Sequence, residues 1–307
     1  MTANVKDAPD DTRQDKLTNS SEIVRLEKHF ELNRRKLTFL VGLVTLLLPT
    51  IMILSSWSGL VQWRDSISHY YYAAWLGDLF VVFVAFIGTF MIAYEGRTDR
   101  ETHLATAAGC ASFGIGIFPT SYSGLENMTS EGALARIFIQ ITSINEPNKG
   151  DLVIEVPTTV VNEIPAPLFG DTACAVGSAF CLFPYSASLH YVCAAFVFGF
   201  LTWYCLFIFT RVDPERHKHN NEITTQKTIR NTIYYLCGGV MLICLIAMGL
   251  RFFLGKDWIW WEEWDVTFWA ETFSLYAFGI GWLVRSRFRG TYLVDPAELE
   301  MTKSETG

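Results

Sequence analysis

Residues 37–56 have the sequence LTFLVGLVTLLLPTIMILSS, twenty positions without a single charged side chain. An apolar run of about 20 residues is the length that a helix needs to cross the roughly 30 Å hydrocarbon core of a bilayer. A lone strand in lipid would leave its backbone groups unpaired, so such a run has to be helical. The stretch therefore predicts a membrane-spanning helix, and this sets the fold class of the whole chain.

Five further apolar runs of similar length follow it. The run at 103–119 is the shortest and requires tilt or local thinning of the bilayer. The six runs predict an all-α, polytopic transmembrane bundle of six helices over residues 37–290. The predicted spans are Leu37–Ser56, Ala73–Tyr94, His103–Pro119, Ser188–Thr210, Asn231–Phe253 and Val266–Arg285.

Composition supports the same class. Of the 307 residues, 50% are hydrophobic and only 18% are charged, whereas soluble domains carry about 25% charged residues. These values exclude a soluble globular domain and a disordered chain. The net charge of −7 would repel phosphate, so nucleic acid is excluded as a partner. Membrane lipids are the predicted partners.

The positive charges are divided unevenly between the two sets of helix ends. Lys and Arg near the ends of spans mark the cytoplasmic side. One side holds sixteen of them and the other only five, so both termini are predicted to be cytoplasmic. The five are Arg64, Arg136, Lys149, Arg251 and Lys256; the sixteen are Arg25, Lys28, Arg34, Arg35, Lys36, Arg97, Arg100, Arg211, Arg216, Lys218, Lys227, Arg230, Arg285, Arg287, Arg289 and Lys303.

Tryptophan supports this orientation. Indole rings gather at membrane–water interfaces, and most of the ten tryptophans fall near the predicted outer boundary. They are Trp57, Trp63, Trp75, Trp258, Trp260, Trp261, Trp264 and Trp269.

Three segments outside the spans are predicted separately. Residues 1–36 form a polar tail, disordered over 1–20, and then an amphipathic stretch (21–36) that either lies on the inner surface or simply leads into the first span. Residues 120–187 form an outer loop whose alternating segments 137–144 and 152–161 predict a β-hairpin. Residues 291–307 form a cytoplasmic tail.

Cysteines and small residues give two further predictions. Cys174 and Cys181 lie seven positions apart in the outer loop and are candidates for a disulfide if the outside is oxidising. In the third span Ala105, Gly109, Ser112 and Gly116 share one face, which is the pattern that lets membrane helices approach closely. Small-residue faces of this kind also allow a homo-oligomer.

Ionisable residues within the spans mark a candidate site, because they are costly in lipid. Asp78 and Glu271 lie roughly 7 Å below the outer ends of their helices, and His190 and Arg251 about 3 Å below, at the helical rise per residue. His69 lies just above them in the connecting segment. Four helices thus deliver two acids, one imidazole and one cation to one leaflet at similar depth.

Three interpretations of this cluster remain open. The first is a structural ion pair of Arg251 with Glu271 or Asp78 that only clamps helices. The second is a metal-dependent lipid hydrolase in which His69, Asp78 and His190 hold Zn²⁺ and activate a water. The third, which we take as the working prediction, is a site that binds the polar group of a lipid or another amphiphile.

One resemblance bears on the hydrolase interpretation. Ser66 and Ser68, His69 and Asp78, followed by a later histidine, loosely resemble the membrane hydrolase superfamily of alkaline ceramidases and adiponectin receptors. That family also has seven spans and a His-x-x-x-His pair in its last helix. Here the last span carries Glu271 and no histidine, so the resemblance fails at its most diagnostic point.

A wider resemblance covers residues 37–290. The chain is similar to six-helix integral membrane proteins of unknown function that occur mainly in bacteria. This resemblance implies a bacterial inner or plasma membrane, six spans and motif positions at Asp78, His190 and Glu271. It also implies that the long segment between 120 and 187 is an insertion. The matching stretches are SIS (66–68) with YY (70–71), GDLFV (77–81), FPT (118–120), LH (189–190), and Glu271 with FGIGWL (278–283).

Overall fold

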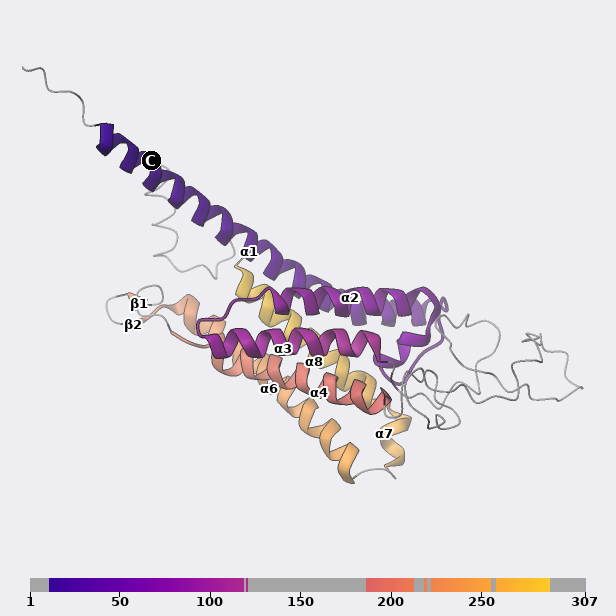
Figure 1. Cartoon of the computed structure of the whole chain (residues 1–307). Helices are drawn as coiled ribbons and strands as arrows, with labels where there is room; N and C mark the ends of the chain where they lie inside the picture. The colour runs from indigo at the N-terminus through magenta and orange to yellow at the C-terminus, as the bar shows by residue number, and fades with distance from the viewer. Residues whose placement is uncertain are drawn as a thin grey trace, which may run out of the picture.

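The computed structural model describes residues 11–118, 120, 186–212, 218–219, 222–254 and 258–287. Successive long helices run in opposite directions along the bundle (Figure 1). The long helices are α1 (Asp11–Trp57), α2 (Ala74–Ile92), α3 (Asp99–Ile117), α4 (Ser186–Trp203), α6 (Thr225–Leu254) and α8 (Val266–Ser286). The shorter elements are the 3₁₀ helix η1 (Ser68–Tyr72), the π-helical turn η4 (Tyr204–Ile208) that continues α4, the antiparallel strands β1 (Lys218–His219) and β2 (Glu222–Ile223), and α7 (Ile259–Glu263).

Each predicted span coincides with one of the long helices, so the expected helical fold is confirmed for the described residues. Four helical stretches are long and apolar enough to cross a membrane: Asn33–Trp57, Trp75–Ile92, Ser188–Ile208 and Thr225–Leu254. The described chain is therefore a helical protein with four candidate membrane spans.

The predicted disorder of residues 1–20 is wrong from Asp11 onwards, where α1 begins. Neither glycine nor proline occurs between Asp11 and Val41, and either residue would weaken a helix. Because α1 continues without a break to Trp57, residues 21–36 are the helical lead-in to the first span.

Several predictions fall outside the described residues. They are the β-hairpin at 137–144 and 152–161, the disulfide between Cys174 and Cys181, and the tail at 291–307. The predicted outer loop is also shorter than expected at its far end, because α4 already begins at Ser186.

The long helices form a closed ring. Each contacts the next along the chain, and α8 returns to pack against α1. Two of these contacts depend on glycine. A Cβ at Gly42 of α1 would lie 2.9 Å from the Gly279 carbonyl oxygen of α8, and one at Gly109 of α3 would lie 2.6 Å from the Gly88 carbonyl oxygen of α2.

The small-residue face predicted for the third span is confirmed at Ala105, Gly109 and Ser112, whereas Gly116 is only half-buried and a Cβ there would lie 3.7 Å from Val81 Cγ1. Ala105, Gly109 and Ser112 are buried, and the Ser112 hydroxyl donates to the Val84 carbonyl oxygen of α2 at 2.9 Å. This face is therefore used for packing inside the chain.

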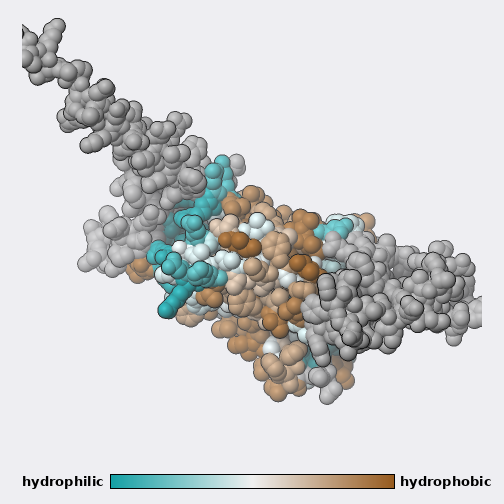
Figure 2. Space-filling view, viewed as in Figure 1, coloured by the Kyte–Doolittle hydropathy of each residue, from teal (hydrophilic) through white to brown (hydrophobic). Residues whose placement is uncertain are grey.

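The two ends of the bundle differ in surface character. Figure 2 shows an apolar band across the middle of the described helices and hydrophilic residues gathered mainly toward the end where β1 and β2 lie. We call this the hairpin end. The opposite end, where α1 leads into α2 and where α7 lies, is the connection end (Figure 1).

Candidate functional site

The candidate site is built on residues 58–73, the α1–α2 connection, which contains η1. Apolar anchors fix this segment to the bundle, because Ile67, Tyr70 and Tyr71 are buried. The Tyr70 hydroxyl lies 2.6 Å from the Ser56 hydroxyl at the end of α1. Gly77 of α2 allows the connection to approach closely, since a Cβ there would lie 2.3 Å from the Tyr71 carbonyl oxygen. The backbone of residues 65–69 is thereby held over the start of α8.

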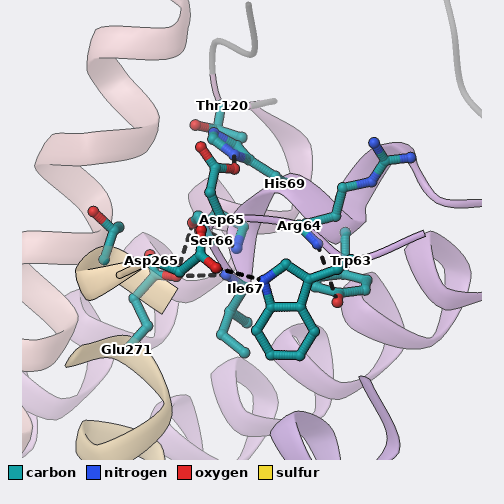
Figure 3. A network of polar contacts seen from close by, with 12 residues as sticks. Trp63, Arg64, Asp65, Ser66, Ile67, His69, Thr120, Asp265 and Glu271 are labelled. Carbon is teal, nitrogen blue, oxygen red and sulfur yellow. Dashed lines mark hydrogen bonds and ion pairs between the residues drawn. The ribbon is translucent and has the colours of Figure 1, made fainter. Parts of the chain in front are cut away.

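Glu271 of α8 is the acid that holds this backbone. Its side chain is buried, and its Oε2 atom accepts hydrogen bonds from the Ser66 hydroxyl at 2.8 Å and from the Ile67 N–H at 2.6 Å (Figure 3). Both donors belong to the α1–α2 connection. Glu271 therefore ties the connection to the first turns of α8.

His190 of α4 makes the second set of contacts, and it is 1% exposed. Its Nδ1 atom lies 2.7 Å from the Phe118 carbonyl oxygen, just beyond α3, and its Nε2 atom lies 3.2 Å from the Ser68 hydroxyl. A carbonyl oxygen only accepts, so Nδ1 carries the ring proton and Nε2 of the neutral ring accepts from the Ser68 hydroxyl.

The contacts of Glu271 and those of His190 are linked within the connection, where the Ser68 N–H donates to the Ser66 Oγ atom at 3.1 Å. We call Ser66, Ser68, His190 and Glu271 the Glu271–His190 network. It runs from α8 through the connection to α4 and to the end of α3. An acid and an imidazole that are far apart in sequence are thus joined through two serine residues.

Asp65 and His69 form a more accessible pair beside this network. The His69 Nδ1 atom lies 2.5 Å from Asp65 Oδ1, and the two side chains are 15% and 42% exposed, respectively. Burial raises the pKa of Asp65, but the hydrogen bond and charge of His69 outweigh this effect and hold the pKa of Asp65 below its usual value. His69 also interacts electrostatically with both Glu271 and His190.

Asp265 is anchored next to the start of α8. Its carboxylate Oδ2 accepts from the Trp63 indole N–H at 2.9 Å (Figure 3). The residue has a φ of +46°, a left-handed conformation that Asp tolerates better than most residues. Burial raises the pKa of the Asp265 carboxyl, and the hydrogen bond from Trp63 opposes that rise.

The structure brings some of the predicted site residues together and gives others different surroundings. Glu271, His190 and His69 meet at the α1–α2 connection. Asp78, one turn into α2, has an exposed side chain. Arg251 forms an ion pair with Glu262 of α7 at 2.6 Å, an acid that the sequence did not suggest as its partner.

Sequence reasoning missed the groups that connect the predicted residues. The hydroxyls of Ser66 and Ser68, the Ile67 N–H and the Phe118 carbonyl make the direct contacts. The two serines are visible in the SIS stretch at 66–68, but their partners become apparent only when the connection is folded over α8. Backbone donors and acceptors leave no signal in the residue types.

The described residues do not assemble a metal site. No group of three His, Cys, Asp or Glu side chains among them is placed to hold one metal ion. His69, Asp78 and His190 therefore do not form such a group. Instead, the ring nitrogens of His190 are both used for hydrogen bonds within the protein.

Comparison with known proteins adds no family assignment. No protein-family model, no curated protein and no solved structure matches this chain.

Proposed function

We propose that the protein is an integral membrane protein of six spans with both termini in the cytoplasm. We also propose that its Glu271–His190 network and the neighbouring Asp65–His69 pair bind the polar group of a membrane lipid. The alternating direction of the long helices supports six crossings. The excess of Lys and Arg at the hairpin end supports placing that end in the cytoplasm.

One observation carries the lipid proposal. The Asp65–His69 pair lies together with the buried Glu271 and His190 at the connection end, which bears the exposed tryptophans. Exposed indole rings mark the level of lipid headgroups. Trp57, Trp75, Trp260 and Trp264 are all exposed, and all belong to the connection end. A polar pair at this depth faces the headgroup region.

A purely structural clamp is the main competing interpretation. Glu271 and His190 would satisfy it, because each holds the connection through hydrogen bonds. The Asp65–His69 pair favours binding, since Asp65 is 42% exposed and an exposed pair adds little to stability. The exposed part of the Asp65 carboxylate is within reach of a headgroup.

The test measures lipid bound to the purified full-length chain in detergent, titrated with phosphatidylglycerol or phosphatidylethanolamine and counted by native mass spectrometry. His69→Gln should weaken binding by roughly tenfold or more, because it removes a group able to make a charge-assisted hydrogen bond. Glu262→Gln is the matched control. It breaks an ion pair at the same end and should leave lipid binding unchanged.

Two results would count against the lipid proposal. If wild type, His69→Gln and Glu262→Gln retain equal amounts of lipid, the site is a structural clamp and not a lipid site. Stoichiometric zinc in the same purified sample would favour the metal-dependent hydrolase instead, with ligands drawn in part from beyond the described residues.

A further inference from the structure

The contact between Ser68 and His190 has the arrangement of a nucleophile and its base. The Ser68 hydroxyl lies 3.2 Å from Nε2 of His190, at the long end of the range expected for a serine activated by an imidazole. The two residues are 122 positions apart in the sequence. They meet because α4 begins beside the α1–α2 connection.

The imidazole is oriented by a third group. Its Nδ1–H donates to the Phe118 carbonyl oxygen at 2.7 Å, which fixes both the ring plane and the tautomer. Nε2 is then the basic nitrogen, and it faces the Ser68 hydroxyl. A base held by a third group in this manner is the general arrangement of an activated hydroxyl nucleophile.

The serine is held in place as well. The Ser68 N–H donates to Ser66 Oγ, and Ser66 is itself tied to Glu271. Ser68 is half-buried, whereas Ser66 and His190 are buried. Ser68 is the most accessible of these three residues. Fixing the reacting group before substrate arrives lowers the entropic part of a reaction barrier.

We infer that Ser68 is a nucleophile and His190 its general base, and that together they cleave an acyl ester of the bound lipid. This inference rests on the proposed lipid site. Ser68 Oγ forms a bond to the ester carbonyl carbon while its proton passes to Nε2 of His190. The carbon–alkoxide bond then breaks, and the proton on Nε2 moves to the leaving alcohol oxygen.

Water completes the cycle. It attacks the acyl carbon of the Ser68 ester and gives one proton to Nε2. The carbon–Oγ bond breaks and that proton returns to Ser68 Oγ, which releases the fatty acid. Ester and water are consumed, acid and alcohol are formed, and no oxidant, reductant or metal takes part. His69, which interacts electrostatically with His190, lies beside the reacting groups.

The experiment treats the full-length protein with a fluorophosphonate probe, which reacts with activated serines, and maps the adduct by mass spectrometry. We expect the adduct on Ser68, with no adduct on Ser58, which is exposed near the same end. Ser68→Ala should abolish labelling and Ser58→Ala should leave the rate unchanged. His190→Gln should slow labelling by about 10²-fold or more, the usual contribution of a general base.

A second measurement covers the case in which His190→Gln fails to fold. In the wild type, the labelling rate should rise with pH and level off as one imidazole loses its proton. Phosphatidylglycerol should also yield lysophospholipid and fatty acid with wild type and with Ser58→Ala, but not with Ser68→Ala. A pH-independent labelling rate would overturn the inference.

The two proposals fail in distinguishable ways. If the wild type binds phospholipid but Ser68 reacts no faster than Ser58, the nucleophile is wrong and the lipid site stands. If neither binding nor labelling occurs, both proposals are wrong and the Ser68–His190 contact only joins the connection to α4.

Discussion

At the scale of single residues, Glu271 shows how a carboxylate is accommodated at the edge of an apolar bundle. Its Oε2 atom accepts hydrogen bonds from one hydroxyl and one backbone N–H, so the buried acceptor is satisfied by the connection. Removing one member of such a buried set leaves the others unsatisfied, which costs about 1–3 kcal/mol for each group. The acid and the connection therefore depend on each other.

This dependence predicts a coupling that a double-mutant cycle will detect. Ser66→Ala and Glu271→Leu should each lower the free energy of unfolding, and the double variant should lose less than the sum by about 0.5–1 kcal/mol, because both remove the same hydrogen bond. The measurement is reversible unfolding of the purified protein in mixed detergent micelles.

Arg251→Met supplies the control for that cycle. Arg251 is paired with Glu262, so its loss should add to the loss from Glu271→Leu within about 0.5 kcal/mol. Recovery of stability in the Arg251→Met, Glu271→Leu double variant would mean that the two residues form the clamp which the sequence suggested.

At the scale of elements, close approach of backbones decides where α2 and α3 meet. Gly88 and Gly109 each lack a Cβ at a point where the partner's carbonyl oxygen lies within 3.0 Å of the position it would take. The Ser112 hydroxyl adds one hydrogen bond across the contact. In lipid, packing of this kind replaces the hydrophobic drive that associates helices in water.

The same substitution at two positions of α3 tests this contact. Gly109→Ala places a Cβ 2.6 Å from the Gly88 carbonyl oxygen, whereas Gly116→Ala meets only Val81 Cγ1 at 3.7 Å. Gly109→Ala should destabilise the protein by about 1–3 kcal/mol through overpacking, and Gly116→Ala should be neutral or slightly stabilising because Ala favours helix. Thermal unfolding of both variants in one detergent is the measurement; equal stability of the two would contradict the proposed contact.

The elements were predictable where one physical property dominates. Length and apolarity located both ends of α2 and α8 to within two residues, whereas α6 begins six residues before the predicted span. The extent of α1 was missed because Asp11–Ser20 is polar, and polarity alone does not distinguish a charged helix from a disordered tail.

In the candidate site, the cost of burying charge singled out Glu271 and His190. Their partners were missed because these are backbone groups and small hydroxyls, which are common everywhere in the chain.

At the scale of the whole molecule, the hairpin end carries its own polar contacts. The Lys227 Nζ atom donates to the Phe209 carbonyl oxygen at 2.9 Å, beside the end of η4. A cation near the last carbonyls of a helix complements its dipole. Arg211, just past η4, pairs with Glu101 in the first turn of α3 at 2.5 Å. The start of α3 and the end of the α4–η4 helix therefore lie at the same end of the bundle.

The Arg211–Glu101 pair also constrains how many times the chain crosses the membrane. If only the four most apolar stretches crossed, from an N-terminus inside, Glu101 would lie inside, whereas Arg211 would follow a third crossing and lie outside. Residues that form an ion pair do not lie on opposite sides of a bilayer about 30 Å thick. If α3 and α8 cross as well, the two residues share the cytoplasmic side, together with most of the Lys and Arg residues.

Reporter fusions should therefore distinguish six spans from four. A reporter inserted at Asn148 should be external and one in the 217–221 loop cytoplasmic if six helices cross, and the two locations exchange if four do. A fusion after Gly307 is cytoplasmic in both cases, so it tests the orientation of the chain and not the number of spans. An external signal after Gly307 would overturn the proposed orientation. A cytoplasmic signal at Asn148 would remove α3 from the spans and leave the Arg211–Glu101 contact without an explanation.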